Sequence, residues 1–169
     1  MGKKEIILVD KKNNEIGVGE KLDVHRKGKL HRAFSVFVFS SNGELLIQKR
    51  AKRKYHSGGL WSNTCDGHPR PNKKIEDEAK KRLGEEMGFE CDLRELFNFT
   101  YKRKVGDLIE HEIDHILIGE SSEKPKPNKK EVEDYKWVSC NDLKKDVKNN
   151  PQNYTSWFKL IFNKVIKKI

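Results

Sequence analysis

The residues of this 169-residue chain whose types and spacing suggest chemistry are histidines and glutamates. Three of the six histidines, His25, His31 and His68, stand close to glycines. Glu110 and Glu112 alternate within a predicted strand, so both side chains point to one face, where they repel each other unless a positive charge lies between them. Imidazole and carboxylate ligands suit Mn²⁺, Zn²⁺ or Fe²⁺ better than Ca²⁺. Spacing alone leaves two interpretations, a metal site or a solvated strand face with three surface histidines.

The other three histidines show no comparable pattern. His111 falls between the two glutamates and is expected on the opposite face of the strand. His56 and His115 have no evident partner. We expect these three to be surface or loop residues and not metal ligands.

A further pair of carboxylates stands at the end of the best helix candidate, residues 75–87. Apolar residues recur there every four positions, which predicts a helix with one apolar stripe: Ile75, Ala79, Leu83 and Met87. Gly88 follows, as is typical of a helix C-terminus. Glu85 and Glu86 come just before it, and adjacent glutamates are also common on a solvated helix face.

The elements that must position these residues are mostly strands. Extended segments are predicted at 5–9, 16–19, 33–39, 44–48, 93–101, 109–119 and 132–138, and further helices at 141–147 and 156–168. Residues 41–43 (Ser-Asn-Gly) predict a hairpin turn between two of the strands. The order of elements predicts an α+β fold, an α/β/α sandwich around a mixed β-sheet, and the length fits one domain over residues 1–169.

The composition indicates a folded chain with no membrane span. Hydrophobic residues make up 34% and charged residues 37%, with the apolar runs well placed for a core. No run reaches the ~20 apolar residues that cross a bilayer, and no signal peptide is predicted, so we expect a cytoplasmic protein. The three cysteines, Cys65, Cys91 and Cys140, are an odd number without a close pair, which favours reduced thiols over disulfides or a zinc site.

The net charge is +10. A basic chain of this kind suits nucleic acid, an anionic membrane surface or a phosphorylated substrate, and a lysine-rich composition without function would look the same. The basic residues are dispersed, with a denser group at 49–54. No aromatic-basic recognition motif for RNA is visible, so a nucleic-acid-binding module ranks last among the functions considered.

The segment from residue 67 to residue 89 resembles the Nudix box, a loop–helix–loop whose glutamates hold Mg²⁺ on a diphosphate. The matching positions are Gly67, Glu85, Glu86, Gly88 and Phe89. Lys73 and Arg82 stand where the box has glutamates, and Lys81 stands at its arginine. Because hydrolysing members use the glutamate at the Arg82 position for metal binding, a hydrolase of nucleotide or prenyl diphosphates is kept only as the alternative.

Nearly the whole chain is similar to type I isopentenyl-diphosphate isomerases, Nudix-fold enzymes that keep the diphosphate intact. The similarity is carried by residues 20–25, 30–35, 49–51, 59–63, 67–69, 101, 110–112, 131–137 and 156–157. The resemblance implies interconversion of isopentenyl and dimethylallyl diphosphate in isoprenoid biosynthesis. It implies a small-molecule prenyl diphosphate as partner, without nucleic acid or membrane insertion, and a monomer or weak dimer.

The resemblance also implies the residues of the site. Mn²⁺ or Zn²⁺ would be held by His25, His31, His68, Glu110 and Glu112. Mg²⁺ would accompany the substrate diphosphate at Glu86. The diphosphate would be bound by the basic positions Lys21, Arg50, Lys54 and Arg82.

Isomerisation adds a proton to the terminal alkene carbon and removes one from the neighbouring methylene, through a tertiary carbocation. The resemblance assigns proton transfer to Glu112 with Tyr101 beside it. It places the face of Trp157 against the cation, worth up to about 2 kcal/mol or more when desolvated. Trp157 is equally expected to be a core residue of the last helix.

Asp66 stands where the family has its catalytic cysteine, and Cys65 lies one residue earlier. Neighbours on an extended segment point in opposite directions, so Cys65 is not expected to replace the missing thiol. A free aspartic acid has a pKa of about 3.9, so Asp66 would need burial or the nearby Glu112 to raise that pKa before it could donate a proton. We expect a working isomerase with paired carboxylates, or else a relative with altered or lost activity.

Overall fold

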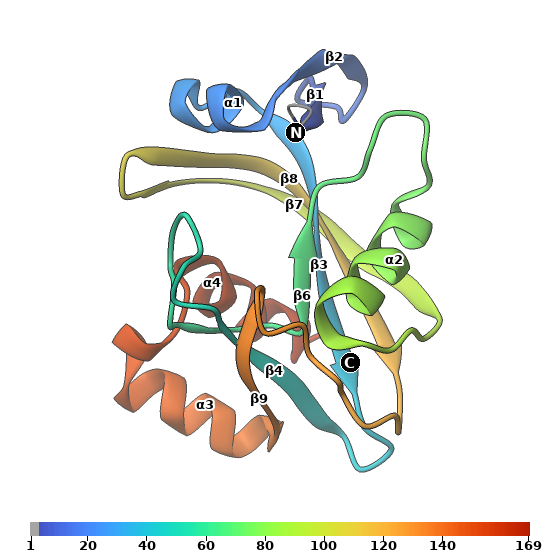
Figure 1. The fold of residues 1–169 in the computed structure, drawn as a ribbon, viewed down its shortest axis with the longest axis vertical. Coiled ribbons are helices and arrows are strands. Elements are labelled where there is room, and N and C mark those ends of the chain that lie inside the picture. Colours follow the sequence, from blue (N-terminus) through green and yellow to red (C-terminus); the bar gives the residue numbers. More distant parts are fainter. Residues whose placement is uncertain (1–3) are drawn as a thin grey trace.

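The computed structural model describes residues 4–169 and shows a mixed β-sheet between helices (Figure 1). The strands are β1 (Glu5–Val9), β2 (Glu15–Glu20), β3 (His31–Phe39), β4 (Glu44–Arg50), β5 (Trp61–Ser62), β6 (Cys65–Gly67), β7 (Leu93–Val105), β8 (Leu108–Glu120) and β9 (Val132–Ser139). The helices are α1 (Lys21–Lys27), α2 (Ile75–Met87), α3 (Cys140–Asn149), the short 3₁₀ helix η1 (Pro151–Asn153) and α4 (Ser156–Val165). Within these residues, no helix combines the length and the apolar character needed to cross a bilayer.

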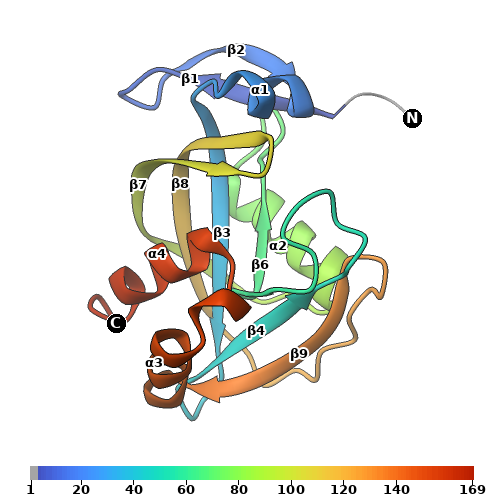
Figure 2. The same ribbon diagram turned by 90° about the vertical axis from the view of Figure 1, so that its left-hand side faces the viewer.

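Strand β3 lies at the centre of the sheet and brings the site residues together. It pairs in parallel with β8, with His31 beside Glu112, and antiparallel with β6, with Ser35 beside Asp66. Strands β7 and β8 form a long antiparallel hairpin (Figure 2). The sheet therefore contains both parallel and antiparallel pairs, which confirms the predicted mixed sheet.

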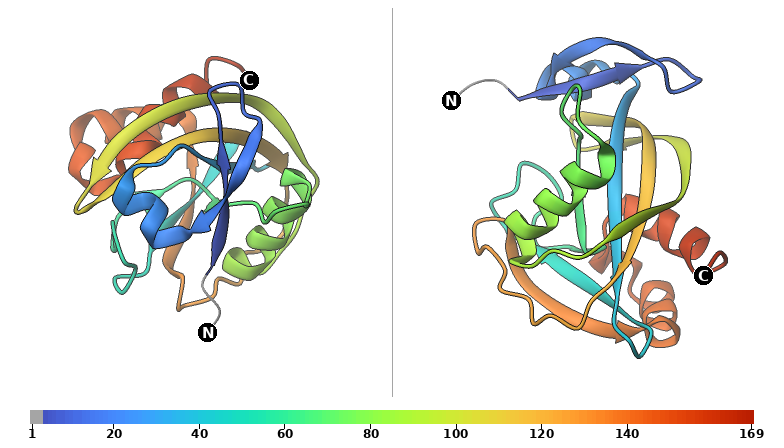
Figure 3. Two further views of the ribbon diagram at one scale, coloured as in Figure 1. Left: turned by 90° about the horizontal axis from the view of Figure 1, so that it is seen from above. Right: turned by 90° about the vertical axis from the view of Figure 1, so that its right-hand side faces the viewer.

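The two faces of the sheet carry separate apolar cores, and helices cover both (Figures 1 and 3). Along β3, Val36 and Val38 pack with α2, while Phe37 packs with α4. This division follows from the alternation of side chains along a strand. Helices on both faces of a mixed sheet confirm the predicted α/β/α sandwich.

Helix α2 has the bounds that its apolar stripe predicts, and Gly88 ends it in the left-handed conformation with a φ of 75°. Helix α1 was not predicted. It has only seven residues and buries just Val24 and His25, too few to form a recognisable stripe. The carboxylate of Glu20 accepts hydrogen bonds from the first backbone N–H groups of α1, and Gly28 closes its other end.

The predicted turn at residues 41–43 is confirmed and joins two antiparallel strands, although these strands pair over a short distance only. Strands β3 and β4 are registered at Phe39 and Leu45, after which β4 turns away to pair with β5 and β9. The physical reason is that the edges of β3 are already occupied by β6 and β8.

Two glycines with nearly the same backbone conformation give a test of the packing around α2. Gly88 has a φ of +75° and Gly43 a φ of +76°, but a Cβ at Gly88 would lie 2.3 Å from the carbonyl oxygen of Lys126, whereas Gly43 has open space. We expect Gly43→Ala to cost about 1–2 kcal/mol of the free energy of unfolding. Gly88→Ala should cost about 1–3 kcal/mol more, because it adds a steric clash. Urea unfolding of both variants measures the difference, and equal losses would contradict the close approach at Lys126.

Candidate active site

An open cleft of about 570 Å³, partly exposed to solvent, contains most of the predicted site. Its walls come from the N-terminal segment, β3, the loop between β4 and β5, β6, α2, the β7–β8 hairpin and the start of α4. The predicted residues that line it are Lys21, Arg50, Lys54, Asp66, His68, Arg82, Glu86, Tyr101, Glu110, Glu112 and Trp157. His25 and His31 are buried behind this surface.

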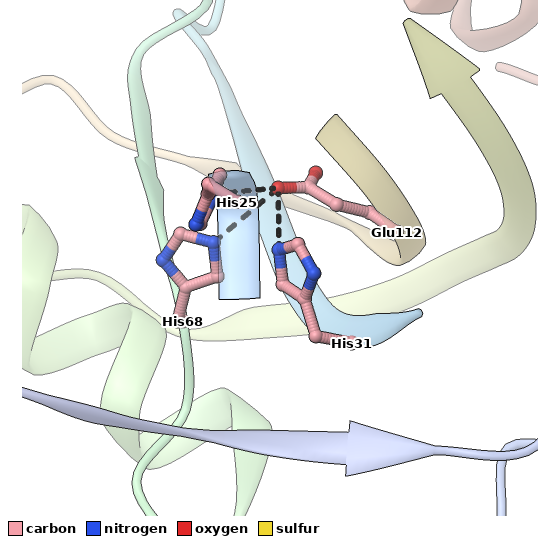
Figure 4. A group of neighbouring side chains, drawn as sticks. All are labelled: His25, His31, His68 and Glu112. Atoms are coloured by element: carbon pink, nitrogen blue, oxygen red, sulfur yellow. Dashed lines mark hydrogen bonds and ion pairs between the residues drawn. The ribbon is translucent and has the colours of Figure 1, made fainter. Parts of the chain in front are cut away.

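His25, His31, His68 and Glu112 converge on one point although four separate segments carry them (Figure 4). Their ligand atoms all lie within 4.8 Å of one another. Oε1 of Glu112 is 3.2 Å from Nε2 of His31, 3.3 Å from Nε2 of His68 and 4.0 Å from Nε2 of His25. Ligands about 2.1 Å from a shared tetrahedral ion stand roughly 3.4 Å apart, so the spacing fits a metal.

The hydrogen bonds behind the cluster fix which nitrogen of two rings faces Glu112. Nδ1 of His25 lies 2.6 Å from the carbonyl oxygen of Lys21, and Nδ1 of His31 lies 2.9 Å from that of Lys29. A carbonyl oxygen only accepts, so each Nδ1 donates its proton there and Nε2 is the nitrogen that faces Glu112. When the ring is protonated, Nε2–H donates to Glu112, and when the ring is neutral, Nε2 offers its lone pair to a metal ion.

Electrostatics favour the protonation states that bind metal. Burial lowers the pKa of His68 well below its usual value and also lowers the pKa of His25. Burial alone would raise the pKa of Glu112, but its contacts with His31 and His68 hold that pKa well below the usual value. Neutral imidazoles and an ionised carboxylate are the forms that coordinate metals, so the chemistry of the donor set fits a divalent ion.

Glu110 lies beside this cluster and not among its four converging atoms. The hydroxyl of Tyr101 donates to Glu112 at 2.7 Å and lies 3.3 Å from a carboxylate oxygen of Glu110. Both glutamates therefore share one face of β8, as predicted. Burial, with the charge of Glu112, raises the pKa of Glu110 to about 8. Coordination by Glu110 stays a prediction.

Asp66 points into the cleft, and Cys65 points away from it. Cys65 is fully buried in the core under α2, as the opposite orientation of neighbours on a strand predicts. The side-chain amide of Asn63 donates to one oxygen of Asp66 at 2.7 Å, and Nε1 of Trp157 donates to the other at 3.2 Å. Burial raises the pKa of Asp66 to about 6, against the opposing effects of Asn63 and Arg50. All three cysteines are free thiols, as expected.

The predicted diphosphate-binding cations lie along the basic wall of the same cleft: Lys21, Arg50, Lys54 and Arg82. The Nε atoms of Arg50 and Arg82 are buried and have no hydrogen-bond partner within residues 4–169. Guanidinium donors of this kind suit the oxygens of an anion. Lys4 also lines the wall, although the sequence did not single it out.

Glu86 lies at the base of the basic wall, and both of its oxygens have partners. Nη2 of Arg82 is 2.6 Å from Oε1, and the side-chain amide of Gln48 donates to Oε2 at 2.7 Å. The adjacent Glu85 is exposed at the surface of α2. Mg²⁺ at Glu86 would therefore either share these oxygens with Arg82 and Gln48 or displace one of them.

Of the histidines expected at surface or loop positions, His115 differs from that expectation. His115 is buried in β8, and its ring contacts Glu95 at 2.9 Å and Asn13 at 3.0 Å, because both faces of this strand are covered. His56 does lie on a loop, but it faces the cleft, where burial and then Arg50 lower its pKa to about 3. His111 contacts the carbonyl oxygen of Gly28 on the opposite face from the two glutamates, as expected.

Asp114 is a buried carboxyl group that sequence analysis missed. It continues the alternation of Glu110 and Glu112 along β8, and following this period two residues further would have found it. The hydroxyl of Ser35 donates to one oxygen of Asp114 at 2.8 Å, and the other oxygen has no hydrogen-bond partner among the described residues. Burial, with the charge of Glu112, raises the pKa of Asp114 well above its usual value.

Known structures and families identify the class of this fold. The NUDIX domain family matches residues 29–158. A crystal structure from Deinococcus radiodurans superposes with a TM-score of 0.79 over 95% of this chain and 98% of that chain, at 16% identity. The MutT protein of Methanosarcina mazei gives a TM-score of 0.67 over 82% of this chain and 94% of that chain, at 15% identity. The fold and the cleft therefore define a NUDIX-domain protein.

Curated relatives show to which family of NUDIX-domain proteins the chain belongs. Isopentenyl-diphosphate Delta-isomerase 2 of Photorhabdus laumondii is 52% identical, covering 94% of this chain and 90% of the relative. Isopentenyl-diphosphate Delta-isomerase 2 of Aromatoleum aromaticum is 47% identical, covering 96% of this chain and 86% of the relative. The chain belongs to the isopentenyl-diphosphate Delta-isomerase family of NUDIX proteins.

Proposed function

We propose that this chain interconverts isopentenyl diphosphate and dimethylallyl diphosphate and depends on a divalent metal. The observation that supports this most directly is that one cleft contains the histidine cluster with Glu112, the carboxyl group of Asp66 and a wall of cations. The names of the curated relatives point to the same reaction.

The metals are proposed from the chemistry of their ligands. Mn²⁺ or Zn²⁺ suits His25, His31, His68 and Glu112. Glu110, which shares the Tyr101 hydroxyl with Glu112, is a further candidate ligand. A bound ion would hold Glu112 ionised and in one orientation. Mg²⁺, which prefers carboxylate and phosphate oxygens, would join Glu86 to the substrate diphosphate.

Two protons must move during the reaction. One group adds a proton to the terminal alkene carbon, and another removes a proton from the methylene, whose C–H electrons form the new double bond. Asp66 on β6 and Glu112 on β8 face the cleft from strands on either side of β3, which suits them for these roles. The Tyr101 hydroxyl, 2.7 Å from Glu112, orients that carboxylate.

Trp157 connects the proton-transfer group to the position where positive charge develops. Its Nε1 holds Asp66, and its ring lines the cleft while the residue is only 4% exposed. A desolvated indole face can stabilise a carbocation. Trp157 is also part of the core under α4, so both roles proposed for it are compatible.

The basic wall favours retention of the diphosphate over its hydrolysis. Arg82 stands where hydrolysing members have a glutamate, and it pairs with Glu86 and Glu131. Lys54 also pairs with Glu131, so these cations are already held around one point. Arg and Lys donors placed this way bind phosphate oxygens.

The assignments that concern the whole chain are also proposals. A single domain over residues 1–169 is supported by the pairing of β3 with β1 and β8 in one sheet. We expect the enzyme to act in the cytoplasm as a monomer or weak dimer, on a small-molecule prenyl diphosphate and without nucleic acid.

The proposed function is tested by incubating the purified chain with isopentenyl diphosphate, Mg²⁺ and Mn²⁺, while both allylic product and phosphate are measured. We expect dimethylallyl diphosphate without phosphate release, and bound metal in the same sample. Phosphate release without allylic product would establish the hydrolase instead. Binding of the diphosphate without turnover would indicate a catalytically impaired relative.

A further inference from the structure

The loop between β4 and β5 carries His56 into the wall of the cleft, next to two residues proposed for the reaction. Its ring is perpendicular to that of Trp157, at 89°, with the ring centroids 5.6 Å apart. Its Nε2 lies 3.5 Å from Oε1 of Glu110. A side chain on a loop can hold such a position only if the loop itself is fixed.

Backbone contacts fix the path of this loop. The N–H of Gly59 donates to the carbonyl oxygen of Arg50 at 2.9 Å, which closes the loop at its base. A Cβ at Gly58 would lie 2.4 Å from the carbonyl oxygen of Lys52, so the backbones of the two sides of the loop are in close contact. Ser57 adopts a φ of 53°, a strained value for a residue other than glycine and one that tends to occur at functional sites.

The polar atoms of His56 are oriented as well. The hydroxyl of Ser57 lies 3.2 Å from Nδ1, and a hydroxyl can donate to that nitrogen. The Nε2–H then faces Glu110. Nη2 of Arg50 donates to the carbonyl oxygen of His56 at 3.3 Å, and the same guanidinium lies 5.1 Å from the ring centroid of Trp157.

We propose that His56 is a positioning residue that holds the ring of Trp157 and the carboxyl group of Glu110 against the five-carbon chain of the substrate. This inference rests on the proposed function. Its ring supplies an apolar edge to Trp157, and its Nε2–H supplies a polar contact to Glu110. The two contacts can be removed separately, because phenylalanine keeps the aromatic ring and glutamine keeps an N–H donor.

The experiment compares His56→Ala, His56→Phe and His56→Gln with the unchanged chain. A misplacement of about 1 Å near the reacting atoms can cost ~100-fold in rate, so we expect His56→Ala to lower kcat by roughly 30- to 100-fold. KM should change by less than about threefold, because the diphosphate-binding wall is intact. The Phe and Gln variants should each recover part of the loss. His111→Ala, on the opposite face of β8, is the matched control and should retain full activity.

A second measurement does not depend on turnover. With Trp61 and Trp137 replaced by phenylalanine, acrylamide quenching reports on Trp157 alone. His56→Ala should raise the quenching constant about two- to threefold and His56→Phe should not, since only the former uncovers the indole. The inference would be overturned if His56→Ala left the quenching of Trp157 unchanged. It would also be overturned if the enzyme were active and the Ala, Phe and Gln variants had equal kcat values. If the unchanged chain has no activity, the proposed function fails and the quenching result alone decides the role of His56.

Discussion

Replacing His68 with glutamine is expected to abolish tight metal binding and to lower turnover by roughly a thousandfold. Nε2 of His68 is one of the four ligand atoms around the common point and lies 3.3 Å from Glu112. Without this imidazole, two nitrogens and a carboxylate remain, and Glu112 loses a contact that keeps it ionised. The loss of a metal ion that stabilises charge by several kcal/mol accounts for the size of the effect, since about 4 kcal/mol is a thousandfold in rate.

This prediction is tested by measuring the metal content of His68→Gln after dialysis, together with its kcat. His111→Gln is the control, because it makes the same change next to Glu112 in sequence, but on the face of β8 that contacts Gly28. It should keep both metal and activity. If His68→Gln retained a full complement of metal, the four-residue cluster would not be the binding site, whatever happened to the rate.

The parts of this site that the sequence predicts are those governed by local periodicity. The four-residue spacing along residues 75–87 gives α2 its bounds, because that spacing is close to the helix period of about 3.6 residues. The two-residue period of a strand places Glu110 and Glu112 on one face and turns Cys65 away from Asp66. These predictions need no knowledge of distant contacts.

What the sequence does not predict depends on contacts between distant segments. The position of His56 is set by the closure of its loop onto Arg50 and by the place of α4, about a hundred residues further along the chain. The divergence of β4 from β3 depends on which strands occupy the edges of β3. The convergence of the three histidines was available only from the family resemblance, because no periodicity relates His25, His31 and His68.

Replacing Asp66 with asparagine is expected to lower kcat by about 100- to 10,000-fold, the range typical of a lost general acid or base. Asparagine keeps the shape of the side chain but cannot exchange a proton. Asp66 faces the cleft and is held at both oxygens, by Asn63 and by Trp157, so its carboxyl group has one fixed orientation. Burial raises its pKa to about 6, which gives it a larger protonated fraction at neutral pH than a free aspartic acid has.

The comparison that decides the role of Asp66 pairs this variant with Asp66→Cys and Cys65→Ala. A thiol at position 66 would point into the cleft, so Asp66→Cys should retain activity well above that of Asp66→Asn. Cys65 is buried under α2, so Cys65→Ala should lower stability slightly while kcat stays unchanged. Full activity in Asp66→Asn would exclude proton transfer by this residue, and loss of activity in Cys65→Ala at unchanged stability would assign the chemistry to the thiol. The expected pattern assigns proton transfer to the side chain at position 66, because of the two neighbours only Asp66 lines the cleft.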